Sequence, residues 1–266
     1  MTSLMNDPPF NGAPTGPISM PPRDAAPIAY FYLLFSIDLI KEFVKQTNRG
    51  SFPSFFNMGL IRKVSIEEYL NKHNPSQSTP WFRCMFSRNR FQKILNFLHL
   101  VDTKKLPKRN DPAYRPSQRF KPLLDFVNRK FLRFYNPRRE LAVDESLVGT
   151  KGKTSMLQYI PSKRSRFGVK FLMLVESVTG YVLQKDVYHG KHFDPTPAGT
   201  LQGTNVVMNL MKSSNLLGQG FHVFADSFFA SLNLVKKLLR ERTYLTDTMR
   251  TNRPMPQMIK NARPYI

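Results

Sequence analysis

The chain has 266 residues and is 41% hydrophobic, which is enough to bury a sizeable core. Its 40 Lys and Arg against 18 Asp and Glu give a formal net charge of +22, which points to a polyanionic partner, most often nucleic acid and less often an anionic membrane. We expect no small-molecule substrate. The less specific alternative is a ribosomal protein, or a protein whose basic composition has no particular functional role. Cys84 is the single cysteine, so the sequence excludes a disulfide framework and a cysteine-based zinc module, and it fits a reducing intracellular location.

The first part of the chain divides into a Pro-rich segment and a helical one. Residues 1–27 hold seven of the 21 prolines with little apolar periodicity, which predicts a disordered tail. The stretch IAYFYLLFSIDLI at 28–40 is too short to span a bilayer, so we interpret it as core and expect no membrane anchor. Apolar residues recur at three- and four-residue steps from Phe31 to Val44, which predicts a helix, and SIEEYL at 65–70 predicts another.

Two more amphipathic helices are predicted over 87–100 and 123–135, each with basic residues beside an apolar stripe. A single basic helix face is usually ordinary surface. Residues 83–139, however, hold 16 Lys and Arg against 3 Asp and Glu, so we expect a phosphate backbone to lie there. The basic loop KKLPKRNDPAYRP at 104–116 is a weak match to a nuclear localisation signal. The candidate DNA contacts on the helix over 87–100 are Arg88, Arg90 and Lys93.

After Pro137 the pattern changes to strands with two intervening helices. This alternation predicts a mixed α/β sheet with helices packed against it. The strands are predicted over 140–148, 168–177, 180–190, 221–227 and 243–250, and the helices over 197–212 and 231–242.

Two of these strands share one feature, an Asp at or near the end of an apolar run. The sequences are AVDES, with Asp144, and FADSF, with Asp226. If the two strands are neighbours in one sheet, both carboxylates emerge at the same edge and can bind Mg²⁺ together with waters and phosphate oxygens. Such metals activate a water or a 3′-hydroxyl in phosphodiester cleavage and strand transfer. The alternative is that both residues only cap the turns that follow, which is a common use of Asp.

Several other residues are candidates for a metal site or for phosphate contacts. His189 and His192 have a spacing that suits zinc, but no further ligand joins them, so an exposed loop is favoured. Glu176 is expected at the surface, as is Glu145, while Trp81 is expected in the core. The basic residues that follow Asp144 in sequence are candidate phosphate contacts, or else solvated loop charges; they are Lys151, Lys153, Lys163, Arg164 and Arg166.

Several blocks of the sequence, in order, resemble the piggyBac transposase family and its domesticated transposable element-derived members. The longest runs from ELAVDESLVGTKGK through YIPSKRSRFGVKFLMLVES to GYVLQKDVYHGK, and FADSFFASLNLVKKLL with DTMRTNRPMP forms another. FSRNRFQKILNFLHL and the segment from PPFNGAPTGP to IKEFVKQTNR resemble the family's N-terminal part. The resemblance implies an RNase H-like DDE fold that uses three Asp residues and Mg²⁺ to nick and join transposon-end DNA.

The resemblance also assigns roles along the chain. Asp144 matches the family's first catalytic Asp and Asp226 its second, which makes both candidate metal ligands. The third lies roughly a hundred residues beyond the second in the family, as does a Cys-rich zinc module, and the sequence ends at Ile266. Ser227 stands where the family usually has Asn. Asp247 stands where it usually has Gly, and is a poor substitute for the third Asp because it lies on a different predicted strand.

These observations define the expected organisation and function. We expect a disordered tail over 1–27, a helical basic dimerisation and DNA-binding region over 28–139, a partial RNase H-like catalytic domain over 140–250, and the start of an insertion region over 251–266. The expected function is nuclear binding of double-stranded DNA by a transposase-derived protein, as a possible homodimer, without catalysis by this chain alone. The alternatives are an active Mg²⁺-dependent transposase whose third Asp comes from elsewhere, and a non-catalytic protein-interaction scaffold.

Overall fold

A computed structural model describes residues 9–47, 61, 63, 65, 67–71, 78–96 and 99–249. The chain divides into two compact units. One consists of residues 1–25, 115–117 and 124–266, and the other of residues 26–114 and 118–123. The expected insertion region over 251–266 lies outside the described residues. Among the described residues, no helix has both the length and the apolar character that crossing a membrane requires.

The regular elements of the second unit's described part are all helices or 3₁₀ turns. Its elements are α1 (Pro27–Leu34), α2 (Ile37–Thr47), the 3₁₀ turn η1 (Glu67–Leu70), α4 (Pro80–Met85), α5 (Arg88–Asn96), the 3₁₀ turn η3 (Thr103–Lys105) and the start of α6 (Lys121–Phe134). Tyr69, Phe82, Phe86 and Phe91 are buried between these helices, whereas Trp81, which was expected in the core, is exposed.

The helix predicted from Phe31 to Val44 is two helices in the structure. The first ends where the Phe35 N–H donates to the Phe31 carbonyl, and Ser36 then accepts from the Leu39 N–H at 3.4 Å. A serine hydroxyl that accepts from a following backbone N–H is a typical helix start, so Ser36 begins α2. The apolar periodicity continues across both helices, and for that reason it did not reveal the break.

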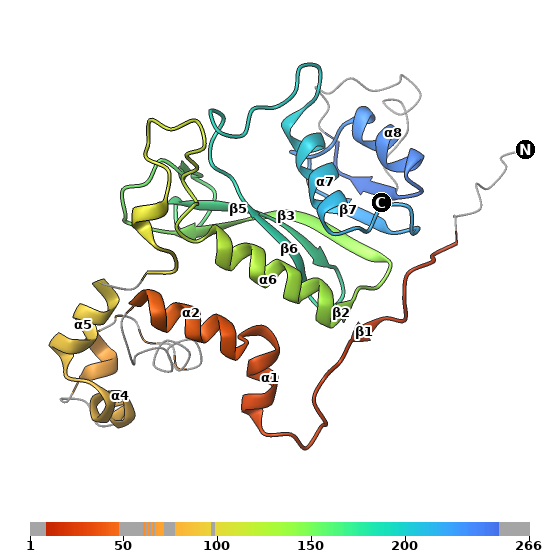
Figure 1. Ribbon diagram of the computed structural model, residues 1–266. Coiled ribbons are helices and arrows are strands. Elements are labelled where there is room, and N and C mark those ends of the chain that lie inside the picture. The colour runs from red at the N-terminus through yellow and green to blue at the C-terminus, as the bar shows by residue number, and fades with distance from the viewer. Residues whose placement is uncertain are drawn as a thin grey trace, which may run out of the picture. The chain divides into compact units, whose positions relative to one another are not determined.

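The first unit contains a six-stranded mixed sheet (Figure 1). Along the sheet the order is β6-β5-β3-β7-β8, and β4 pairs with the start of β5. β3 runs antiparallel to β5 and parallel to β7, and β7 runs parallel to β8. The strands are β3 (Glu140–Gly149), β4 (Leu157–Tyr159), β5 (Phe167–Glu176), β6 (Val182–Val187), β7 (His222–Ala225) and β8 (Tyr244–Asp247).

One face of this sheet is buried beneath helices α6, α7 (Gln202–Ser213) and α8 (Leu232–Arg240). Leu141 and Val143 of β3 and Val223 of β7 point into this core and are almost fully buried. The alternating residues, among them Ala142 and Asp144, therefore lie on the opposite face, because successive side chains of a strand alternate between faces. The register of each strand thus decides which polar residues the helices leave accessible.

The N-terminal segment differs from the disordered tail that the sequence predicts. Residues 1–8 lie outside the described part, but β1 (Gly16–Pro17) pairs with β2 (Tyr135–Asn136), and the Asn11 N–H donates to the Gln219 carbonyl at 2.9 Å. The Phe10 ring packs edge-on against Phe221 with 5.0 Å between ring centroids. A phenylalanine and a short extended pairing therefore anchor a segment whose proline content predicts disorder.

Candidate metal and nucleic-acid site

Asp144 and Asp226 lie next to each other on adjacent parallel strands. The pairing of β3 with β7 runs in register to the pair Val143 and Ala225, and the two Asp residues follow directly on each strand. Both side chains are exposed. Because Val143 points into the core, each Asp that follows points away from it, so both carboxylates lie on the face opposite to the core helices α6, α7 and α8. The sequence placed Asp144 near the end of its strand. β3 in fact continues to Gly149, paired with β5, and only its pairing with β7 ends there.

The two carboxylates are held by similar local hydrogen bonds. Asp144 Oδ1 accepts from the Glu145 N–H at 2.7 Å, and Asp226 Oδ1 accepts from the Ser227 N–H. The Thr248 hydroxyl donates to the same Asp226 oxygen at 3.3 Å. Neither carboxylate has an ion-pair partner among the described residues. Both therefore keep acceptor capacity toward solvent, which a ligand or a cation can use.

A close contact between α7 and the loop after β7 fixes the position of Asp226. Gly203, in the first turn of α7, lies so close to this loop that a Cβ atom there would be 2.6 Å from the Phe228 carbonyl oxygen. The loop closes with the Phe229 N–H donating to the Asp226 carbonyl at 2.9 Å. Ser231 then begins α8 by accepting from the Leu234 N–H at 3.0 Å. The backbone of Asp226 is thus held by packing that does not involve its carboxylate.

Asp247 does not join the pair, although its strand is adjacent. In the register of β7 and β8, Asp247 is opposite Ala225, so it lies on the core side rather than on the side of Asp226. Its Oδ2 atom is buried without a hydrogen-bond partner among the described residues, and burial raises its pKa. Across the same residues, no three His, Cys, Asp or Glu side chains come together in a group that could hold one ion. The geometry therefore agrees with the sequence argument that Asp247 is a poor third carboxylate.

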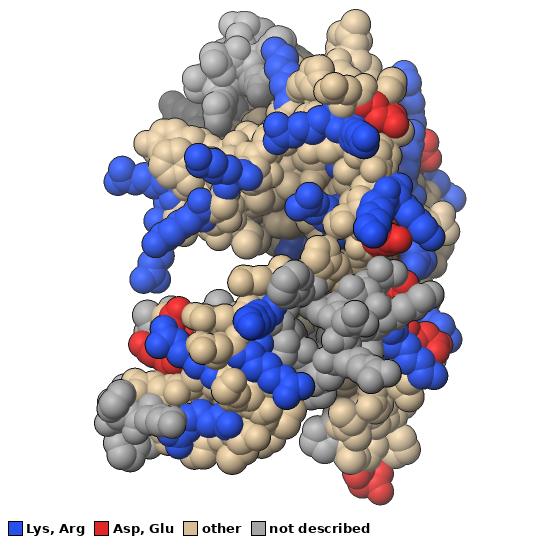
Figure 2. Space-filling view, turned by 60° about the vertical axis from the view of Figure 1, so that its left-hand side comes forward, with Lys and Arg blue, Asp and Glu red and all other residues tan. Residues whose placement is uncertain are grey.

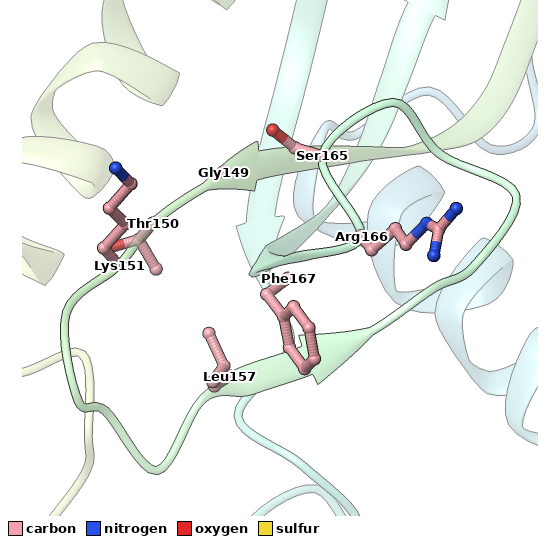
Figure 3. Close-up of a pocket in the computed structure, with 7 residues that line it drawn as sticks. All are labelled: Gly149, Thr150, Lys151, Leu157, Ser165, Arg166 and Phe167. Atoms are coloured by element: carbon pink, nitrogen blue, oxygen red, sulfur yellow. The ribbon is translucent and has the colours of Figure 1, made fainter.

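The basic residues that follow Asp144 form a cationic loop and hairpin at the far end of β3. Four of the five candidate contacts are exposed and the fifth, Lys163, forms an ion pair with Glu145 at 4.0 Å. Glu145, which was expected at the surface, is partly buried in this pair. An open cavity of about 520 Å³ lies here (Figure 3), lined by Gly149, Thr150, Lys151, Leu157, Ser165, Arg166 and Phe167. This end of the sheet thus combines positive charge with a hollow surface.

The basic candidates of the helical unit are also at the surface. Arg88, Arg90 and Lys93 of α5 are exposed, and the Arg90 guanidinium lies 5.9 Å from the centroid of the Phe86 ring. None of the three forms an ion pair with another described residue, although the pKa of Glu67 is lowered by the hydrogen bonds of that carboxylate and, after these, by the charge of Arg88. Figure 2 shows that Lys and Arg side chains outnumber Asp and Glu over the visible described surface. Both units therefore contribute positive charge that a polyanion can contact.

Glu176, which was expected at the surface, is fully buried. Its carboxylate accepts hydrogen bonds from the Thr179 N–H at 2.8 Å, the Val178 N–H at 3.4 Å and the Thr179 hydroxyl. Burial is the largest influence and raises the pKa of Glu176, but these hydrogen bonds, with the nearby charge of Arg138, together lower the pKa below its ordinary value. The residue organises the turn between β5 and β6, and this role is structural.

His189, which was expected in an exposed loop, is buried in a polar chain. Its Nε2 lies 2.7 Å from the Ser117 hydroxyl, and its Nδ1 lies 3.1 Å from Asp194 Oδ1. The sequence of groups resembles a hydrolytic triad, but Ser117 is fully buried and cannot meet a substrate. His192 is exposed and makes an edge contact with Phe193 instead. The two histidines therefore do not form a zinc pair.

Comparisons with known proteins identify the class to which this sheet and its paired carboxylates belong. A protein-family model described as Transposase IS4 matches residues 55–264, which is most of the chain. A solved piggyBac transposase, determined by cryo-electron microscopy as a synaptic complex with hairpin DNA, superposes with a TM-score of 0.80 and 25% identity over 96% of this chain and 57% of that chain. The predicted RNase H-like mixed sheet, preceded by a helical region, is therefore confirmed.

Curated relatives narrow the class further. The chain is 26% identical over 190 residues to the human PiggyBac transposable element-derived protein 3, covering 71% of this chain and 30% of that protein. It matches the human chimeric ERCC6-PGBD3 protein with the same identity over the same length, which is 17% of that protein. The chain belongs to the Transposase IS4 family and, within it, to the piggyBac transposases and their derived proteins. It spans less than a third of the length of these curated relatives.

Proposed function

We propose that this chain is a DNA-binding protein derived from a cut-and-paste transposase, and that it binds double-stranded DNA across the sheet face that carries Asp144 and Asp226. The observation that carries the proposal is the register of β3 and β7, which places both carboxylates side by side on the face opposite to the core helices. The cationic hairpin lies at the end of the same strand β3. A related transposase has been solved in complex with DNA, which supports the same class of partner here.

The two carboxylates suit a magnesium ion as far as the described residues go. Mg²⁺ is usually held by one or two carboxylates, with waters and substrate phosphate oxygens completing its shell. Asp144 and Asp226 would provide the carboxylate oxygens, and both have solvent-facing acceptor capacity. When bound between such ligands, a divalent ion polarises a phosphodiester and activates the attacking oxygen. The chain's own contribution is to hold the two carboxylates in register on the face opposite to the core helices α6, α7 and α8.

The basic side chains would orient the DNA rather than read its sequence. Lys and Arg contacts to phosphates fix the position of a duplex but carry no base information. In this proposal the hairpin residues Lys151, Lys153, Lys163, Arg164 and Arg166 hold phosphates near the sheet, and Arg88, Arg90 and Lys93 contact a further stretch of backbone. Lys163 would first have to exchange its ion pair with Glu145 for a phosphate.

We further propose that a polypeptide of residues 1–266 binds DNA without cleaving it efficiently. The family resemblance expects a third Asp about a hundred residues beyond Asp226, and Asp247 lies on the wrong face to replace it. Loss of one ligand from a two-metal site removes much of the stabilisation of the transition state. In the same proposal the protein acts in the nucleus, as a possible homodimer.

Salt-dependent binding tests the DNA proposal. A labelled duplex should bind residues 1–266 with an affinity that falls steeply with salt, since each phosphate contact contributes a slope of about −0.9 in log K against log salt. Replacing Lys153 and Arg164 by Ala should reduce the slope by about two. A matched control is Lys236→Ala, on the exposed side of α8, which should leave the slope unchanged. Binding that does not respond to salt, or that responds equally to the control, would contradict the proposal and favour a protein-interaction scaffold.

Metal binding tests the role of the carboxylate pair. Titration of Mn²⁺ into the complex of protein and duplex should show a weak site that Asp144→Asn and Asp226→Asn both abolish. Asp247→Asn is the matched control, because that carboxylate lies on the other face, and it should leave the site intact. Cleavage of transposon-end DNA is measured alongside. Efficient Mg²⁺-dependent cleavage by residues 1–266 would overturn the proposed inactivity while leaving DNA binding in place.

A further inference from the structure

Two aromatic rings stand exposed beside the cationic cavity. Tyr159 of β4 and Phe167 of β5 are 56% and 54% exposed, although they are cross-strand partners in the sheet. Their ring centroids are 4.8 Å apart with 37° between the ring planes. Val148 and Leu157 beside them are also exposed, at 48% and 37%. Soluble proteins rarely expose several large apolar side chains together unless the patch binds something.

The charge around this aromatic pair selects the kind of partner. Between Glu145 and Glu176 the sequence has six Lys and Arg and no Asp or Glu. Figure 3 shows Phe167 and Leu157 facing the hollow, with Lys151 on one side and Arg166 on the other. A purely apolar partner surface would have no favourable electrostatic interaction with these cations. An anionic polymer with flat apolar groups matches both features, and nucleic acid is that polymer.

The geometry favours unpaired bases over an intact duplex. Inside a duplex the base faces are covered by their stacked neighbours, so an aromatic ring can stack only on a base that is unpaired or turned out of the helix. The cavity of about 520 Å³ falls within the range of about 300–1,000 Å³ that small-molecule sites occupy, so it has room for one base. Exposed rings with flanking cations are the usual elements of single-strand binding surfaces.

The pair also lies on the same face of the sheet as the carboxylates. Val148 pairs with Val169 and Asp144 with Met173, so the odd-numbered residues of β5, Phe167 included, point to the side of Asp144. Phe167 is level with residue 150, six residues along β3 from Asp144. At about 3.3 Å per residue this distance is about 20 Å, which corresponds to about six nucleotide steps of duplex rise.

From these observations we propose that Tyr159 and Phe167 form a stacking platform for unpaired bases of bound DNA, while Lys151 and Arg166 hold the adjoining phosphates. This inference rests on the proposed DNA-binding function and specifies it further. The platform would keep one strand open or turned away from its partner at a fixed distance from the carboxylate pair. It would also explain why two aromatic rings remain exposed at the end of the sheet.

Binding of three probes tests the platform. The probes are an oligothymidine of about 16 nucleotides, a blunt duplex, and the same duplex with an internal single-stranded gap. Tyr159→Ala and Phe167→Ala should each weaken binding of the oligothymidine and the gapped duplex by about 5- to 150-fold, as expected for the loss of one stacked base. Binding of the blunt duplex should change by less than about twofold, and the salt slope should stay the same, because no charge is removed.

Conservative variants separate stacking from folding. Tyr159→Phe and Phe167→Tyr keep a ring and should retain binding of the gapped duplex, and circular dichroism establishes that each Ala variant is folded. Arg166→Ala should weaken all three probes alike, because it removes a phosphate contact. If the wild type binds the blunt duplex but the Ala variants bind the gapped one unchanged, the platform is overturned and the DNA-binding proposal stands. If the wild type binds none of the probes, the DNA-binding proposal itself fails.

Discussion

Replacement of Glu176 by Gln tests how a buried carboxylate supports the sheet. The turn between β5 and β6 directs the N–H groups of Val178 and Thr179 and the Thr179 hydroxyl at this side chain. A glutamine keeps one acceptor oxygen, but it loses the negative charge and turns an amide N–H₂ toward a backbone donor. Hydrogen bonds to a charged group contribute about 1.5–3 kcal/mol each to stability. We therefore expect Glu176→Gln to lower the free energy of unfolding by about 1.5–3 kcal/mol.

The pH dependence of the free energy of unfolding tests this prediction most directly. The hydrogen bonds to Glu176 lower its pKa below the ordinary value of 4.5. A carboxylate with a lowered pKa contributes stability that is present above the unfolded pKa and is lost as pH falls through the folded one. The difference between wild type and Glu176→Gln should therefore be full at neutral pH and should shrink as the pH falls below 4.5.

Urea unfolding of both proteins at several pH values measures this difference. For a domain of this size, 1 kcal/mol corresponds to about 2–4 °C in melting temperature, so thermal unfolding should show a drop of about 3–12 °C at neutral pH. Glu140→Gln is the matched control, because Glu140 begins the neighbouring strand and is only partly buried, and it should stay within about 0.5 kcal/mol. A difference that does not change between neutral and acidic pH would refute the reasoning.

Three further changes should alter stability in defined directions. Gly203→Ala should cost about 1–3 kcal/mol through overpacking against the loop backbone, whereas Gly152→Ala should cost little, and paired thermal unfolding compares them. Asp247→Asn should stabilise the fold at neutral pH and not in acid, because burial raises the pKa of this carboxyl and stability is lost as pH rises through that pKa; equal effects at pH 3 and pH 7 would contradict this. His189→Ala should cost about 1–3 kcal/mol by leaving buried polar groups unpaired, while the exposed His192→Ala should be neutral, and similar urea midpoints for both would count against the buried chain.

The placement of β3 and β7 in one sheet was within reach of sequence reasoning. In each strand an Asp follows an apolar run, and the alternation of strands and helices after Pro137 predicts one mixed sheet in which the two strands can be neighbours. The alternation of apolar and polar residues does not predict the register between paired strands. That register decides on which face of the sheet each Asp lies. A slip of one residue would have turned Asp226 into the core and Asp247 toward Asp144.

The wrong predictions for three residues have related physical causes. In each case the residue contacts a partner that the neighbouring sequence does not reveal. His189 is buried because it meets Ser117, which lies 72 residues earlier. Glu176 is at a strand end, where a carboxylate usually faces water, but the following turn and the hydroxyl of Tyr135, 41 residues earlier, contact its carboxylate. Phe10 stands among prolines, yet its contact with Phe221 orders the segment around it.

The contact of Phe10 with Phe221 has a consequence for how the first unit assembles. The helical unit is inserted between two parts of this unit along the chain, so residue 10 must wait for residue 221 before it can dock. Closing a loop of about 210 residues costs about 4–5 kcal/mol of chain entropy. Sheet contacts that form earlier between nearer residues shorten the effective loop and reduce this cost. The contact of Phe10 with Phe221 is therefore expected to form last, after the strands have paired. During synthesis β1 can pair with β2 once residues 135–136 have emerged, but Phe10 stays without its partner until Phe221 has been made, so docking of this ring is a late and separate step in folding.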